Sequence, residues 1–124
     1  MEQKTILVAG GSGYIGTHTL ISLYAAGYRA VCADNFTNSH PEALRRTEAI
    51  IGTKIPLYEV DVCDRQAVEQ IFAENSIAGV INFAGLKAVG ESVEKPLEYY
   101  DINLNSTLSL LQAMRRHNCR VMIF

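Results

Sequence analysis

Apolar residues occur along the chain in short continuous runs and in longer stretches with helical spacing, and the two kinds alternate. A short run predicts a buried strand, because a strand covered on both faces carries apolar residues at every position. Pro56 cannot donate a backbone hydrogen bond, so it marks either an edge strand or the start of a strand. We predict strands over residues 5–9, 29–34, 55–60, 79–83 and 120–124.

Between these strands the sequence carries the start and stop residues of helices. Pro41 and Pro96 suit a first helical position, Gly52 suits a helix end, and Asp64 suits an N-cap. The last helix is predicted from an apolar stripe at spacings of three and four. That stripe consists of Leu97, Tyr100, Leu104, Leu108 and Leu111. We predict helices over residues 14–26, 41–51, 64–75 and 96–117, and a loop over residues 86–94.

The predicted strands and helices alternate throughout the chain. This order requires a parallel sheet with right-handed crossovers and with helices on both faces. We therefore predict an α/β protein with a Rossmann-like, doubly wound parallel sheet. At 124 residues the chain has the length of one domain, which we expect to span residues 1–124.

The composition is that of a folded protein without a charge surplus. Hydrophobic residues make up 48% of the chain and charged residues 19%, which excludes intrinsic disorder. With 11 basic and 13 acidic residues the net charge is −2, so the sequence gives no electrostatic basis for binding nucleic acid or an anionic membrane. No apolar run approaches the roughly 18 residues of a membrane span, and no secretory signal is recognisable.

The three cysteines, Cys32, Cys63 and Cys119, have the spacing of neither a disulfide framework nor a zinc site. We expect them to be reduced, mostly buried apolar residues. Reduced thiols are typical of the cytoplasm, which is the location we expect. We expect no metal.

The run Gly-Gly-Ser-Gly-Tyr-Ile-Gly follows the first predicted strand and opens the first helix. It fits GxGxxG through Gly11, Gly13 and Gly16, and GxxGxxG when Gly10 comes first. A dinucleotide pyrophosphate needs this close approach to backbone N–H groups and the positive end of a helix. Asp34 ends the second strand 18 residues after Gly16, where a carboxylate accepts both ribose hydroxyls and repels a 2′-phosphate. This predicts NAD rather than NADP. The alternative is a glycine-rich corner followed by an ordinary loop acid.

Asp61 stands after the third predicted strand, which in this topology lies beside the adenine pocket. Its carboxylate therefore becomes a second candidate for cofactor binding. The alternative is an ordinary capping acid.

Longer stretches of the sequence resemble one known family. They are GGSGYIG at 10–16, DN-x-x-NS at 34–39, the pair Asp61-Val62 and, most specific of all, FAGLKAVGESVEKPLEYYD at 83–101. These stretches are similar to the N-terminal part of the UDP-glucose 4-epimerase family, within the extended short-chain dehydrogenases/reductases. The resemblance covers essentially the whole chain, with departures at Ala9, Asn82, Ile102 and Ser106.

The resemblance implies an NAD cofactor and a UDP-hexose substrate. Hydride leaves sugar C4 for NAD⁺, the 4-keto sugar rotates, and the hydride returns to the other face. Residues 13–15 would contact the pyrophosphate, residues 34–38 the adenosine ribose and phosphates, Asp61 and Val62 the adenine, and Phe83 and Lys87 the nicotinamide half. The full set of expected cofactor-binding residues is Gly10, Gly13, Tyr14, Ile15, Gly16, Asp34, Asn35, Phe36, Thr37, Asn38, Asp61, Val62, Phe83, Ala84, Gly85, Lys87 and Asn103.

The catalytic pattern of the resembled family, Tyr-x-x-x-Lys, does not occur in the sequence. None of the 6 tyrosines is followed four positions later by lysine. Hydride removal needs a base for the sugar hydroxyl proton. We therefore expect these 124 residues alone to be inactive, because they contain neither a catalytic residue nor a substrate domain. We also expect the Rossmann-like sheet to be truncated after the fifth strand. Two alternatives stay open: another NAD-dependent nucleotide-sugar enzyme such as a dehydratase, and a non-catalytic dinucleotide-binding module. A homodimer also stays open.

Overall fold

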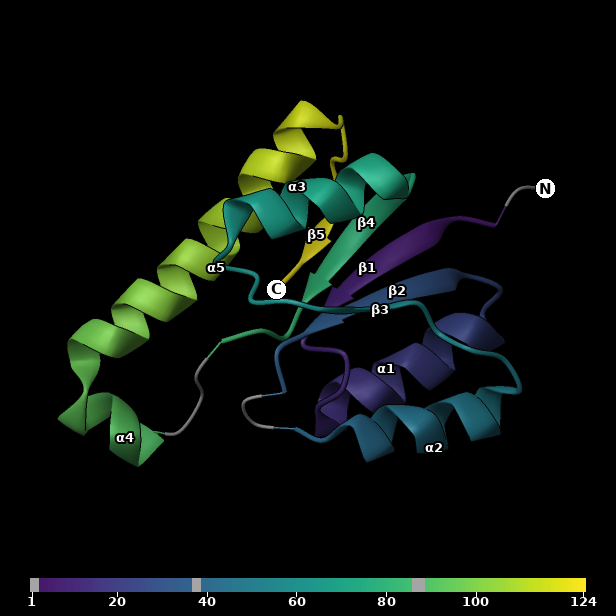
Figure 1. Cartoon of the computed structure of the whole chain (residues 1–124), viewed down its shortest axis with the longest axis horizontal. Helices are drawn as coiled ribbons and strands as arrows, with labels where there is room; N and C mark the ends of the chain where they lie inside the picture. The colour runs from purple at the N-terminus through teal and green to yellow at the C-terminus, as the bar shows by residue number, and fades with distance from the viewer. Residues whose placement is uncertain (1–2, 37–38, 86–88) are drawn as a thin grey trace.

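Strands and helices alternate along the chain in the computed structural model, which describes residues 3–36, 39–85 and 89–124 (Figure 1). The elements are β1 (Thr5–Ala9), α1 (Tyr14–Ala25), β2 (Arg29–Asp34), α2 (Pro41–Ile51), β3 (Leu57–Glu59), α3 (Arg65–Glu74), β4 (Ile77–Asn82), α4 (Val89–Glu94), α5 (Pro96–Arg116) and β5 (Met122–Ile123). The strands predicted over 5–9 and 29–34 and the helix predicted over 41–51 are confirmed to the residue.

The strands form a parallel sheet in the order β3-β2-β1-β4-β5. The chain runs outward from β1 to β3 and then returns to the other side of β1 with β4, so the direction of winding reverses between β1 and β4. Open α/β sheets bind ligands at the carboxyl ends of their strands at such a reversal. The Rossmann-like fold class is confirmed, and β3, which follows Pro56, lies at an edge of the described sheet.

Helices cover both faces of the sheet, α1 and α2 on one and α3 and α5 on the other (Figure 1). Successive side chains of β1 serve opposite faces. Leu7 belongs to the core cluster that includes α3 and α5, whereas Val8 belongs to the one that includes α1 and α2. Both side chains are fully buried. This arrangement explains why the strands are continuous apolar runs rather than alternating patterns.

The helix ends follow local sequence rules. The Asp64 carboxylate caps α3 by accepting from the N–H groups of Gln66 and Ala67 at 3.1 and 3.2 Å. Gly52 ends α2 in the left-handed region, with φ 85°, and its N–H donates to the carbonyl of Glu48. These interactions satisfy backbone groups that a helix end leaves unpaired.

Several predicted elements differ from the structure. The strand predicted over 55–60 is shortened to Leu57–Glu59, and the one predicted over 79–83 is Ile77–Asn82. Two further differences concern the C-terminal half. Residues 89–94, predicted as loop, form α4. The helix is only six residues long and of its described side chains none is buried, so its sequence is too short to show a helical pattern. The strand predicted over 120–124 is reduced to Met122–Ile123, which pairs with Val80 and Ile81 of β4.

The apolar stripe of α5 points away from the sheet. Its side chains range from 42% exposed at Leu111 to 79% at Leu97. The buried face instead carries Tyr99, Ser106, Ser109, Leu110, Ala113 and Met114, the last three of which belong to the core cluster that includes β1 and β4. An extended apolar surface therefore remains on the outside of the helix. No helix in the described ranges, α5 included, is long and apolar enough to cross a membrane.

Candidate functional site

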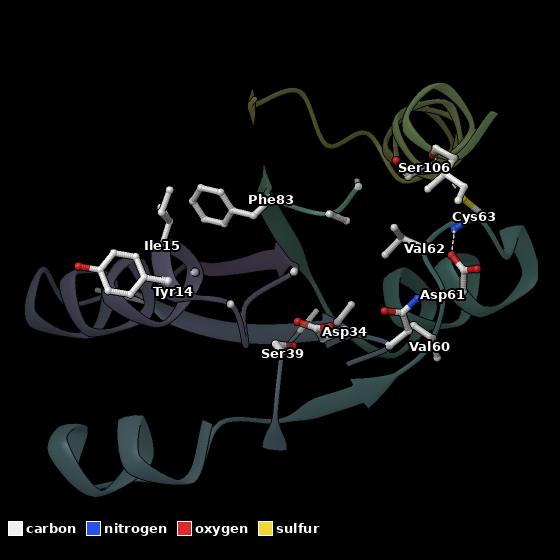
Figure 2. A pocket seen from close by; sticks show the side chains of 18 of the residues that line it. Tyr14, Ile15, Asp34, Ser39, Val60, Asp61, Val62, Cys63, Phe83 and Ser106 are labelled. Carbon is white, nitrogen blue, oxygen red and sulfur yellow. Dashed lines mark hydrogen bonds between the residues drawn. The ribbon is translucent and has the colours of Figure 1, made fainter. Parts of the chain in front are cut away.

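A cavity of about 530 Å³ opens at the carboxyl ends of the strands, within the usual range for small-molecule sites. The glycine loop and the start of α1 form one wall, and the loop after β3 and α5 form the other (Figure 2). Glu91 of α4 also lines the cavity. The lining residues are Gly10, Gly13, Tyr14, Ile15, Gly16, Ala33, Asp34, Asn35, Ser39, Val60, Asp61, Val62, Cys63, Phe83, Ala84, Gly85, Glu91, Tyr99, Ile102 and Ser106.

Two glycines of the loop stand where no side chain fits. A Cβ on Gly10 would lie 2.8 Å from the carbonyl carbon of Phe83, and the φ of Gly10 is +76°. A Cβ on Gly16 would lie 2.5 Å from the carbonyl oxygen of Gly10. The Gly10 N–H also donates to the carbonyl of Ala33 at 2.7 Å, which fixes the loop against the end of β2. The loop is therefore a tight, preformed turn whose glycines let α1 begin directly beside the sheet.

The start of α1 is suited to an anion. Its N-cap, Gly13, makes no side-chain capping hydrogen bond, and the first turn holds no acidic residue. The N–H groups of a first helical turn have no partner within the helix, and they carry partial positive charge. Because Gly13, Tyr14 and Ile15 line the cavity, these groups are available to a phosphate there.

The Asp34 carboxylate is held in place by two backbone donors. The N–H of Ser12, within the glycine loop, donates to Asp34 Oδ2 at 3.1 Å, and the N–H of Phe36 donates to Oδ1 at 2.8 Å. Phe36 adopts a φ of 59°, an unusual left-handed conformation for a residue with a side chain. Each carboxylate oxygen keeps further acceptor capacity. The geometry joins the loop and the acid into one unit that can accept a diol beside a bound phosphate.

Asp61 braces the loop after β3. Its Oδ1 accepts from the N–H of Cys63 at 2.9 Å (Figure 2), and its carbonyl accepts from the N–H of Asp64 at 2.8 Å. Asp61 thus caps the backbone of its own loop, as the alternative to cofactor binding supposed, while Asp64 fills the N-cap position of α3. Asp61 also lines the cavity, beside the apolar side chains of Val60 and Val62.

Cys63 connects this loop to α5. Its Sγ donates to the carbonyl of Ile102 at 3.5 Å. Burial, then the charge and hydrogen bond of Asp61 and the charge of Asp101, raise the pKa of the Cys63 thiol to about 11. The sulfur is therefore protonated at neutral pH and acts as a donor rather than as a nucleophile.

Most of the predicted site residues line the one cavity, with five exceptions. Phe36 and Asn103 do not line it. The Asn103 side chain packs directly behind Gly85, which does line it, because Asn103 Oδ1 lies 2.6 Å from where a Cβ on Gly85 would stand. Thr37, Asn38 and Lys87 lie outside the described residues. In the described ranges, no group of three His, Cys, Asp or Glu side chains comes together to hold a metal.

Several lining residues escaped the sequence analysis. Ser39 is one; its Oγ is buried and has no hydrogen-bond partner among the described residues. An orphaned hydroxyl in a cavity wall is a polar group that a ligand can satisfy. Tyr99, Ile102 and Ser106 were also missed, although their spacings of three and four place them on one face of α5. The other missed lining residues are Ala33, Val60, Cys63 and Glu91.

Comparison with known proteins places the chain in a family. The family sequence profile described as "NAD dependent epimerase/dehydratase family" matches residues 6–124. The chain belongs to this family. Among curated members, UDP-glucose 4-epimerase of Bacillus subtilis is 51% identical over 119 residues, which cover 96% of this chain and 35% of that protein. UDP-glucose 4-epimerase of Mus musculus is 47% identical over 127 residues, covering 98% of this chain and 37% of that protein.

Solved structures of epimerases share the fold of this chain. UDP-glucose 4-epimerase from Bifidobacterium longum, crystallised in complex with NAD⁺ and UDP, superposes with a TM-score of 0.95 at 55% identity. The match covers 98% of this chain and 36% of that one. The chain thus spans about a third of the length of these relatives, and the matched third contains the glycine loop, Asp34 and the cavity.

Proposed function

We propose that residues 1–124 form one NAD-binding domain, the cofactor-binding part of a UDP-glucose 4-epimerase. The observation that carries the proposal is the unit formed by the glycine loop, the start of α1 and Asp34, joined by the hydrogen bond from Ser12 N–H to Asp34. It is supported by relatives of that name, which match the chain at 47–51% identity over nearly all of its length.

The residues of the cavity fit NAD. The N–H groups at the start of α1 would bind the pyrophosphate, and Asp34 would accept the hydroxyls of the adenosine ribose. Val60, Val62 and Ile102 supply apolar surface for the adenine at the β3 side. The orphaned Ser39 hydroxyl suits a polar group of the same half of the ligand.

The β4 side of the cavity would hold the nicotinamide half. There Phe83, Ala84 and Gly85 line the wall. The N–H of Ala84 donates to Asn82 Oδ1 at 2.9 Å, which fixes the turn after β4. Lys87 is predicted for this half as well, whereas Thr37 and Asn38 are predicted for the adenosine ribose and phosphates.

NAD⁺, when bound, supplies a reversible hydride acceptor for a sugar carbon. The residues of this chain would bind it, orient it across the strand ends and exclude water from its two halves. A base for the sugar hydroxyl is a separate requirement. None of the 6 tyrosines has the Tyr-x-x-x-Lys spacing. We therefore assign the proton transfer to segments of the full-length relatives that these 124 residues do not match.

The intact protein is expected to interconvert UDP-galactose and UDP-glucose, and a polypeptide of residues 1–124 alone is expected to show no turnover. Product analysis by chromatography checks both expectations. Loss of water from the sugar would instead identify a dehydratase. An intact protein that binds NAD but leaves both sugars unchanged would favour a non-catalytic binding module. Turnover by residues 1–124 alone would contradict the assignment of the base elsewhere.

We further propose a homodimer that uses the exposed stripe of α5. Leu97, Tyr100 and Leu104 are each more than half exposed, and they follow one another along the same face of a 21-residue helix. Contiguous apolar patches of this kind are typical of interaction surfaces. A helix face that meets its own copy about a two-fold axis buries the same patch on both partners. Sedimentation of the intact protein tests this proposal.

For the compartment we propose the cytoplasm. Cys32, Cys63 and Cys119 are all unpaired. Burial is the main cause that raises the pKa of Cys32 to about 12, so this thiol stays protonated and unreactive where it packs under the glycine loop. Unpaired thiols of this kind are compatible with a reducing environment.

A further inference from the structure

The short helix α4 has little apolar anchoring of its own. Of its described side chains, Ser92 is half-buried and the others are exposed, with Val93 78% exposed. Its packing is mainly against α5. A helix of six residues has no independent stability in water. Its place in the cavity wall therefore depends on specific contacts with α5.

One such contact is a hydrogen bond between two lining residues of the cavity. The hydroxyl of Tyr99, on α5, donates to Glu91 Oε1, on α4, at 3.0 Å. Tyr99 is only 8% exposed, although its neighbours Leu97 and Tyr100 in the first turns of α5 are largely exposed. A buried phenol with a carboxylate acceptor makes a charge-assisted bond of defined geometry. The pair therefore fixes the position of α4 relative to α5.

On its other side α5 is fixed to the β3 end of the cavity. Ile102, one turn after Tyr99, accepts the hydrogen bond of Cys63, in the loop after β3. A line of contacts thus runs from the β3 loop through α5 to α4. The sheet order puts β3 and β4 on opposite sides of β1. Glu91 stands at the far end of this line, on the helix that follows β4 in the chain.

We propose that Tyr99 and Glu91 are positioning residues that hold α4 as a wall of the cavity on the β4 side and thereby strengthen binding of the nicotinamide half of NAD. The adenosine half binds at Asp34, the glycine loop and the β3 side, and it does not depend on this pair. The inference rests on the proposed function.

The test compares NAD with ADP, which carries the adenosine and diphosphate but lacks the nicotinamide half. Both affinities are measured on the intact protein after removal of bound nucleotide. Tyr99→Phe and Glu91→Ala are each expected to weaken NAD binding about three- to tenfold, the loss of one hydrogen bond, and to leave ADP binding within about twofold of the wild type. Glu91→Gln keeps an acceptor oxygen and is expected to retain most of the NAD affinity.

Two further variants sharpen the result. Because Tyr99 and Glu91 act as one unit, the double variant Tyr99→Phe/Glu91→Ala is expected to bind NAD no more weakly than either single variant. Tyr100→Phe removes a hydroxyl from the next residue of the same helix, which is 67% exposed, and is expected to change neither affinity.

The outcomes separate the inference from the proposed function. A wild-type protein that binds NAD, with Tyr99→Phe binding it equally well, contradicts the inference alone. Equal weakening of NAD and ADP in Tyr99→Phe also contradicts it, because the pair would then only stabilise the fold. A wild-type protein that binds neither nucleotide contradicts the proposed function and the inference together.

Discussion

Gly16→Ala is expected to weaken NAD binding by the intact protein on the order of 10- to 100-fold. The added Cβ would lie 2.5 Å from the carbonyl oxygen of Gly10 and 2.7 Å from the Cα of Gly11. Both neighbours are backbone atoms of the same tight loop, so no side chain can rotate away to make room. The loop or the start of α1 must shift, and the N–H groups that would bind the pyrophosphate shift with it.

Calorimetric titration with NAD, together with thermal unfolding, measures this effect. Gly90→Ala is the matched control, because a Cβ on Gly90 meets no atom of the described residues within 4 Å and the residue lies within α4. It is expected to leave NAD affinity unchanged and to raise stability by roughly 0.5–1 kcal/mol, since alanine is the better helix former. Wild-type affinity in Gly16→Ala would show that the loop does not carry the phosphate.

Asp34→Ser is expected to lower the ratio of NAD to NADP affinity by at least about tenfold. The substitution removes the acceptor for the ribose hydroxyls, which weakens NAD by roughly 1–3 kcal/mol, the range for a charged hydrogen bond. It also removes the negative charge that repels a 2′-phosphate, so NADP does not lose affinity in parallel. The N–H groups of Ser12 and Phe36, which now donate to the carboxylate, become free to meet a phosphate oxygen.

Titration of both cofactors against wild type and variant measures this ratio. Asp64→Asn serves as the control, because Asp64 also follows a strand but caps α3 and does not line the cavity. Asparagine caps a helix about as well as aspartate, so stability and cofactor preference are both expected to stay the same. An unchanged preference in Asp34→Ser would remove Asp34 from the cofactor site.

The parts of the fold that follow local rules could be predicted from the sequence. The runs that became β1 and β2 are apolar at every position inside their polar end residues, because each strand is covered on both faces. Pro41, Gly52 and Asp64 occupy the helix ends for which their backbone or side-chain chemistry suits them. The glycine loop and Asp34 belong to the same class, since their spacing from the first strand is itself the signature of the site.

The parts that depend on tertiary contacts could not be predicted in this way. The apolar stripe of α5 indicates a helix but not its orientation, and the helix instead buries a face that mixes two serines with larger and smaller apolar residues. The helix α4 is too short to show an apolar pattern, and its position depends on packing against α5 and on polar contacts such as that between Glu91 and Tyr99. Cys63 and Ile102 are far apart in the sequence and meet only because α3 and α5 cover the same face.

A crystal structure of the intact protein with NAD tests most directly whether this cavity holds the cofactor. We predict diphosphate oxygens within about 3.2 Å of backbone N–H groups at Tyr14 or Ile15, a hydrogen-bond distance. The adenosine ribose hydroxyls should meet the Asp34 carboxylate, and the nicotinamide should lie on the β4 side, by Phe83. A diphosphate bound away from the start of α1, or an adenosine ribose without contact to Asp34, would contradict the proposed site.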